Sequence, residues 1–174
     1  MVERCGFYVE GDKIIQQNIM FMWELGFDRR AKFEYIKRAI SILDAYDCGR
    51  VAEVTTASPI YKTRSLSPYF INVSGTEKTV EDFYQEDIKP RFGYVPGLME
   101  YLYLTNLTKD NIQAALEYEC YIDIFHNPMK RSGCTQALAL AILRWAIVNN
   151  KADILENETK FLEWYKTMPL EVRY

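Results

Sequence analysis

The segment from Ala137 to Val148 constrains the fold more than any other part of the sequence. Its residues, ALALAILRWAIV, are apolar at every position except Arg144. A helix without a polar face is typical of one that packs on several sides. The segment is also shorter than the roughly 20 apolar residues that cross a bilayer, so we predict no membrane span. We therefore expect a central apolar helix at 134–149, with the rest of the chain packed around it.

Helices are also predicted along most of the remaining chain. Asp28 is a good N-cap for a helix from Arg29 to about Tyr46, because its side chain can accept a hydrogen bond from an unpaired amide of the first turn. The apolar residues of this segment follow the three- and four-residue spacing of an amphipathic helix. Similar patterns, with glycine and proline as boundaries, predict further helices at 14–25, 80–88, 97–104, 108–125 and 157–168.

Strand-like sequence is concentrated near the middle of the chain. Residues 51–56 are rich in β-branched side chains, and residues 69–73 form a second β-like run. The middle of the helix expected at 108–125 also alternates like a strand. We predict a mainly α fold, or an α+β fold with a small β element near residues 51–74. Because no linker divides the 174 residues, we expect one compact helical domain, 1–174.

Charge and cysteine content exclude several classes of function. The chain has 21 Lys and Arg against 24 Asp and Glu, a net charge of −3, which argues against nucleic-acid binding driven by overall charge. Its four cysteines are widely spaced and it has one histidine, so no zinc site, and no other metal or cofactor, is predicted. The N-terminus lacks the pattern of a secretory signal, so we expect a cytoplasmic protein with free, packed cysteines.

The loop before the apolar helix is a candidate ligand site. It combines two cations, a glycine and hydroxyl side chains at a helix N-terminus, where unpaired amides attract anions. The candidate ligand-binding residues are Lys130, Arg131, Ser132, Gly133 and Thr135. The loop lacks the GxxxxGK[ST] pattern of a P-loop. It predicts a small anionic ligand or a nucleotide, and it leaves an enzymatic activity open.

Two other features predict contacts with a macromolecule. The helix at 29–38 carries five cations, including Arg30 and Lys37, and such a face can meet phosphate backbones or an acidic protein. The chain also has 13 tyrosines, a residue type enriched at protein interfaces. We take Tyr101, Tyr103 and Tyr121 as the candidate interface tyrosines, although packing in the core is an alternative for each of them.

These observations lead to one principal hypothesis and two alternatives. Because no complete catalytic set is present, we favour a small cytoplasmic interaction module without enzymatic activity, of the regulator or inhibitor type. Its partner would be another protein or a second copy of the chain. The first alternative is an anionic small-ligand or nucleotide-binding protein that uses the loop 130–135. The second, less favoured, is nucleic-acid binding through the helix at 29–38.

Overall fold

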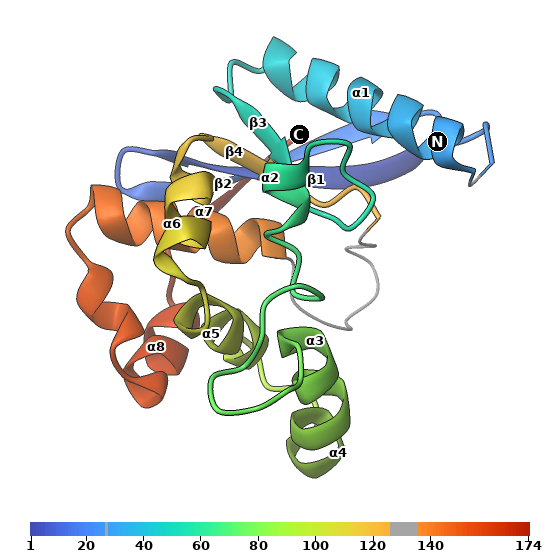
Figure 1. Cartoon of the computed structure of the whole chain (residues 1–174). Coiled ribbons are helices and arrows are strands. Elements are labelled where there is room, and N and C mark those ends of the chain that lie inside the picture. Colours follow the sequence, from blue (N-terminus) through green and yellow to red (C-terminus); the bar gives the residue numbers. More distant parts are fainter. Residues whose placement is uncertain (27, 126–135) are drawn as a thin grey trace.

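The fold is organised around a five-stranded mixed sheet with the strand order β3-β4-β1-β2-β5 (Figure 1). The structure is a computed structural model, and it describes residues 1–26, 28–125 and 136–174. With 46% of residues in helices and 18% in strands, the chain has an α/β fold. The prediction of a mainly α protein with a small β element near residues 51–74 is therefore wrong. Most of the sheet lies outside that region, at the two ends of the chain.

The largest error concerns the first hairpin. Strands β1 (Val2–Glu10) and β2 (Lys13–Phe21) pair antiparallel from Val2 opposite Phe21 to Glu10 opposite Lys13. The predicted helix at 14–25 is thus a strand. Burial does alternate along β2, but one of its inward positions is the polar Gln17, which is 3% exposed. Because this buried residue is polar, the sequence of β2 does not show the alternation of apolar and polar residues that is typical of a strand. The turn at Gly11–Asp12, where Gly11 has a φ of 62°, is a hairpin signal that the helix prediction overlooked.

A second strand replaces part of the helix expected at 108–125. Helix α6 (Lys109–Leu116) begins at its predicted cap, Thr108, and the chain then enters β4 (Cys120–Ile122). This strand pairs parallel to β3 (Val51–Glu53) and antiparallel to β1. The part of the segment that alternates like a strand is therefore a strand, and all three of its residues are buried.

Helices cover both faces of the sheet (Figure 1). On one face lies α1 (Arg29–Ala45), whose buried residues pack on Ile15, Ile19 and Ile122. The helix predicted at 29–46, with Asp28 as its N-cap, is confirmed. The opposite face is covered by α7 (Gln136–Val148), which is buried over most of its length, as expected of the apolar segment. Arg144, the charged residue of that segment, donates a hydrogen bond to the carbonyl oxygen of Tyr118 at 2.9 Å.

The remaining elements are α2 (Tyr61–Arg64), α3 (Val80–Phe83), a π-helical turn (Tyr84–Ile88), α4 (Lys89–Phe92), α5 (Leu98–Thr105), a 3₁₀ turn (Ala152–Leu155) and α8 (Glu158–Tyr165). Of these, α5 and the 3₁₀ turn pack against α7, α8 packs against these two, and α2 packs against α6 and β3. The strand expected at 69–73 is reduced to an isolated bridge between Asn72 and Thr79. The helix predicted at 80–88 is present, but it changes to a π-helical turn after Phe83 and, beyond its predicted end, continues through Pro90 to Phe92.

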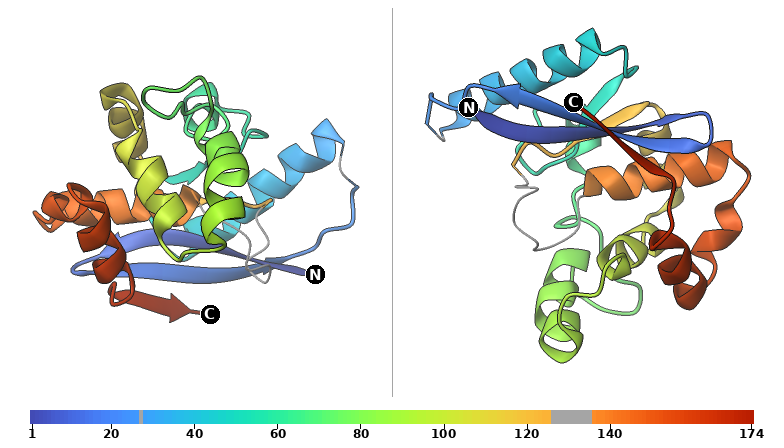
Figure 2. Two further views of the ribbon diagram at one scale, coloured as in Figure 1. Left: turned by 90° about the horizontal axis from the view of Figure 1, so that it is seen from below. Right: turned by 180° about the vertical axis from the view of Figure 1, so that it is seen from behind.

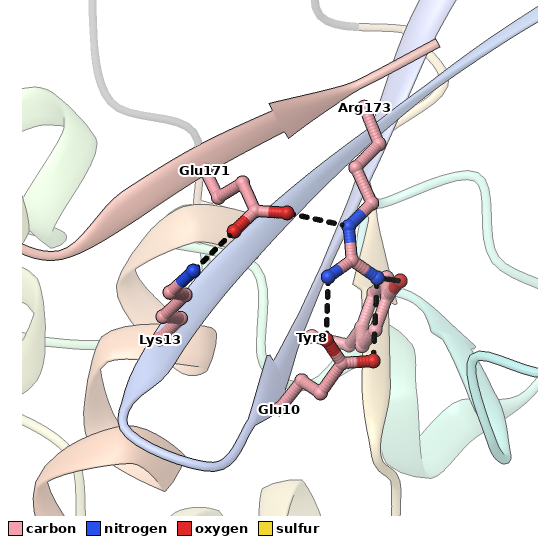
Figure 3. A network of polar contacts seen from close by, with 5 residues as sticks. All are labelled: Tyr8, Glu10, Lys13, Glu171 and Arg173. Atoms are coloured by element: carbon pink, nitrogen blue, oxygen red, sulfur yellow. Dashed lines mark hydrogen bonds and ion pairs between the residues drawn. The ribbon is translucent and has the colours of Figure 1, made fainter.

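The C-terminal strand β5 (Leu170–Arg173) completes the sheet beside the first hairpin (Figure 2). It pairs parallel to β2, and charged side chains reinforce this pairing (Figure 3). The Arg173 guanidinium donates to Glu10, to Glu171 at 2.9 Å and to the Tyr8 hydroxyl at 3.1 Å. Lys13 contacts the other oxygen of Glu171 at 2.7 Å. The two ends of the chain are thereby held together.

Candidate functional site

The parallel strands β3 and β4 end at the same edge of the sheet, and the loop that follows β3 faces the start of α1. Ligands of α/β proteins commonly bind beyond the carboxyl ends of parallel strands. Here that region is hollowed. A cleft of about 920 Å³ lies between the first turns of α1 and the segment 56–64, within the range of roughly 300–1,000 Å³ usual for small-molecule sites. We call it the cationic cleft. It is lined by Arg29, Arg30, Lys32, Phe33, Thr56, Ala57, Ser58, Pro59 and Arg64.

Four of the nine lining residues carry a positive charge and none carries a negative one. Within the described parts of the chain, Arg29, Arg30, Lys32 and Arg64 form no ion pair with a carboxylate. Other cations of α1 do: Lys37 lies 3.6 Å from Glu34. The positive charge of the cleft is therefore not neutralised by the part of the protein that the structure describes.

The position of these charges on α1 is itself unfavourable. Its first turn contains no acidic residue and three cations. The N-terminal end of a helix carries a partial positive charge. Each cation there therefore lowers the stability of the helix by about 0.3–1 kcal/mol, whereas an acidic residue would raise it. The Asp28 carboxylate offsets part of this by accepting a hydrogen bond from the Ala31 amide at 2.8 Å. An anion bound in the cleft would remove the remaining repulsion.

Hydrogen bonds fix the opposite wall of the cleft. The hydroxyl groups of Ser58 and Thr63 contact each other at 2.8 Å, and Thr63 also donates to the Ile60 carbonyl oxygen at 3.1 Å. The Ala57 amide donates to the Thr55 hydroxyl at 3.2 Å. These bonds occupy the buried hydroxyls. Thr56 is exposed, and its hydroxyl makes no hydrogen bond within the described residues, so it is available to a ligand.

Glu53, the last residue of β3, is a buried acid close to this region. Its side chain is 2% exposed, and within the described residues neither carboxyl oxygen makes a hydrogen bond of ordinary geometry. Burial raises the pKa of Glu53 to about 8, and the nearby Asp123 adds to the rise while the Thr55 hydroxyl opposes it. The carboxyl group is therefore mainly protonated at neutral pH. Nothing in the sequence pattern distinguished this acid from a surface residue.

Of the cations predicted from the sequence as site residues, the structure describes Arg30 and Lys37. The candidate ligand loop, Lys130, Arg131, Ser132, Gly133 and Thr135, lies outside the described residues. Arg30 lines the cationic cleft, whereas Lys37 lies further along α1, 4.4 Å from the centre of the Phe33 ring. The structure therefore does not bring these two cations to one site.

The three candidate interface tyrosines are also in different environments. Tyr103 and Tyr121 are fully buried, with their hydroxyls donating to the carbonyl oxygens of Leu66 at 2.5 Å and Ala115 at 2.9 Å. Tyr101 is partly buried and packs on the Phe161 ring. The rings of Tyr103 and Tyr121 are thus core residues that a partner cannot reach.

Thr56 and Arg64, which lie in a loop and in the short helix α2, have no recognisable motif around them in the sequence. They line the cleft because the fold brings them opposite the first turns of α1. Cys5, Cys48 and Cys120 are free and buried, as predicted for packing residues. Among the described residues, no group of three or more His, Cys, Asp or Glu side chains is arranged to hold a metal ion.

Among the helices that the structure describes, none is long and apolar enough to cross a membrane. Comparison of the sequence with models of known protein families and with curated protein sequences found no match.

Proposed function

We propose that the chain is a binding protein for a small, phosphate-bearing anion, which it holds in the cationic cleft. One observation carries this proposal: four cations from two distant segments converge on one cleft without a carboxylate partner in the described structure. A cleft lined by charges of one sign focuses the field and attracts ligands of the opposite sign. Arginine is well suited to phosphate because its planar guanidinium donates two parallel hydrogen bonds.

The geometry also explains why the ligand would be small. The cleft is a hollow of about 920 Å³, and only part of α1 contributes to it. Lys37 and Arg38, further along the same helix, lie near Glu34 and Glu24 instead. The positive charge is thus concentrated at one end of the helix, which supports a compact anion more than an extended phosphate backbone.

The interaction module expected from the sequence has less support. Two of its three tyrosines are buried, so an interface would depend on other exposed aromatic residues. We therefore place anion binding first.

Calorimetric titration with inorganic pyrophosphate at low ionic strength tests the proposal. We expect binding by the wild-type chain and a loss of about tenfold or more in affinity for Arg64→Gln and for Arg29→Gln, since each charge-assisted hydrogen bond contributes roughly 1.5–3 kcal/mol. The control is Arg91→Gln, an exposed arginine of α4 outside the cleft, which should bind as the wild type does.

The thermal unfolding of each variant is measured without ligand to show that it folds. Absence of binding at millimolar pyrophosphate would refute the proposal. An equal loss of affinity in Arg91→Gln would also refute it, because the interaction would then depend on overall charge.

A further inference from the structure

A second hollow adjoins the cationic cleft. Its volume is about 530 Å³, and its lining residues are Thr56, Tyr61, Arg64, Ser65, Phe70 and Asn111. Thr56 and Arg64 line both hollows. The two therefore meet at these residues, with cations predominating on one side and aromatic and amide groups on the other. We call the second hollow the aromatic compartment.

The two aromatic rings of this compartment are exposed and do not belong to the hydrophobic core. Tyr61 is 76% exposed and Phe70 is 56% exposed. The Arg64 guanidinium lies 5.6 Å from the centre of the Tyr61 ring, so the cation shared by the two hollows is also placed beside an aromatic face. Exposed rings next to a positive charge are the elements with which proteins bind nucleotides, by stacking on the base and pairing with the phosphate.

Asn111 adds a polar group to this compartment. Its Oδ1 atom accepts hydrogen bonds from the backbone amide of Thr108 at 3.0 Å and from the Thr108 hydroxyl at 2.7 Å, which form part of the cap of α6. These bonds fix the amide orientation, because only the oxygen of an amide group can accept. The Nδ2 group makes no hydrogen bond within the described residues and is left as a donor.

We propose that the ligand is a nucleoside phosphate, with its phosphates in the cationic cleft and its base in the aromatic compartment. This inference rests on the proposed function, since it assigns the phosphate to the same four cations. The base would stack on Phe70, and the Asn111 Nδ2 group would donate to a carbonyl oxygen or ring nitrogen of the base. Thr56 and Arg64 lie between the two ends, beside the position of the sugar.

The test compares inorganic pyrophosphate with nucleoside diphosphates, which carry the same phosphate chain with a nucleoside added. Calorimetry on the full chain should give at least one diphosphate, among those of adenosine, guanosine, cytidine and uridine, a Kd roughly 5- to 150-fold lower than that of pyrophosphate. That is the range expected for one stacked base. Phe70→Ala should reduce this advantage to near unity and leave pyrophosphate binding unchanged. Phe70→Tyr should retain it.

A matched control is Phe92→Ala, which removes an exposed phenylalanine, 66% exposed, from α4. This variant should bind the diphosphate as the wild type does. If pyrophosphate binds and no diphosphate binds more tightly, the inference fails and the proposed function stands. If neither binds, the proposed function fails as well.

Two further outcomes would overturn the inference. One is a diphosphate advantage that Phe70→Ala does not reduce, because the base would then lie outside the aromatic compartment. The other is a ten-nucleotide single strand of uridine or thymidine that binds more than tenfold more tightly than every diphosphate. That result would assign the two hollows to single-stranded nucleic acid instead.

Discussion

Replacing the buried acid Glu53 by glutamine should make the protein more stable, and the gain should grow with pH. Glutamine has the size of a protonated glutamic acid and never ionises. In the folded chain the pKa of Glu53 is raised to about 8 from an ordinary value of 4.5, mainly by burial. The folded state therefore keeps a proton that the unfolded chain releases, and rising pH favours unfolding between these two values.

The magnitude follows from the same two values. One pKa unit corresponds to about 1.4 kcal/mol. Between pH 4.5 and pH 7, ionisation of the unfolded chain therefore costs the wild type up to about 3 kcal/mol of stability. Glu53→Gln avoids this cost. The two proteins should differ by less than about 1 kcal/mol at pH 5, and the difference should increase up to about pH 8 and then level off.

Urea denaturation of both proteins at pH 5, 6, 7 and 8 measures this difference. The control is Glu163→Gln, which changes an exposed acid of α8 in the same way and should leave the pH dependence as in the wild type. If the stabilities of wild type and Glu53→Gln run parallel from pH 5 to pH 8, the carboxyl group has an ordinary pKa. Burial would then not be what sets its protonation.

Three other perturbations test the packing around the fold. Tyr103→Phe should cost about 1–3 kcal/mol in urea denaturation, because the Leu66 carbonyl oxygen loses its buried donor; an unchanged midpoint would contradict this. Gly97→Ala should lower stability by at least about 1 kcal/mol, since Gly97 has a φ of 85° and an added Cβ would lie 2.7 Å from the Tyr165 ring. Arg173→Ala should accelerate hydrogen exchange of the β5 amides and leave α7 unchanged; equal rates in β5 would show that the ion pairs of Figure 3 do not retain this strand.

The cationic cleft was accessible to sequence analysis only in part. The basic helix at 29–38 was recognised as a charged surface, and this segment does supply three cations of the cleft. The pattern did not reveal that Arg64 joins them, because that contact depends on the path of the loop after β3. The burial of Glu53 also depends on tertiary structure, because an acid in a short strand is buried or exposed according to what packs over it.

Local patterns in the sequence determined the helices whose signals arise within one segment. Asp28 and the apolar spacing after it were sufficient for α1, and the absence of a polar face predicted the buried position of α7. The sheet was decided by tertiary structure. Strand β2 finds its partners in β1 and in β5, the latter more than 150 residues away, and its inward Gln17 obscures the alternation that marks a strand. Helix hydrogen bonds close within four residues, whereas those of a sheet connect distant segments. For that physical reason the sequence alone assigned too many residues to helices and too few to strands.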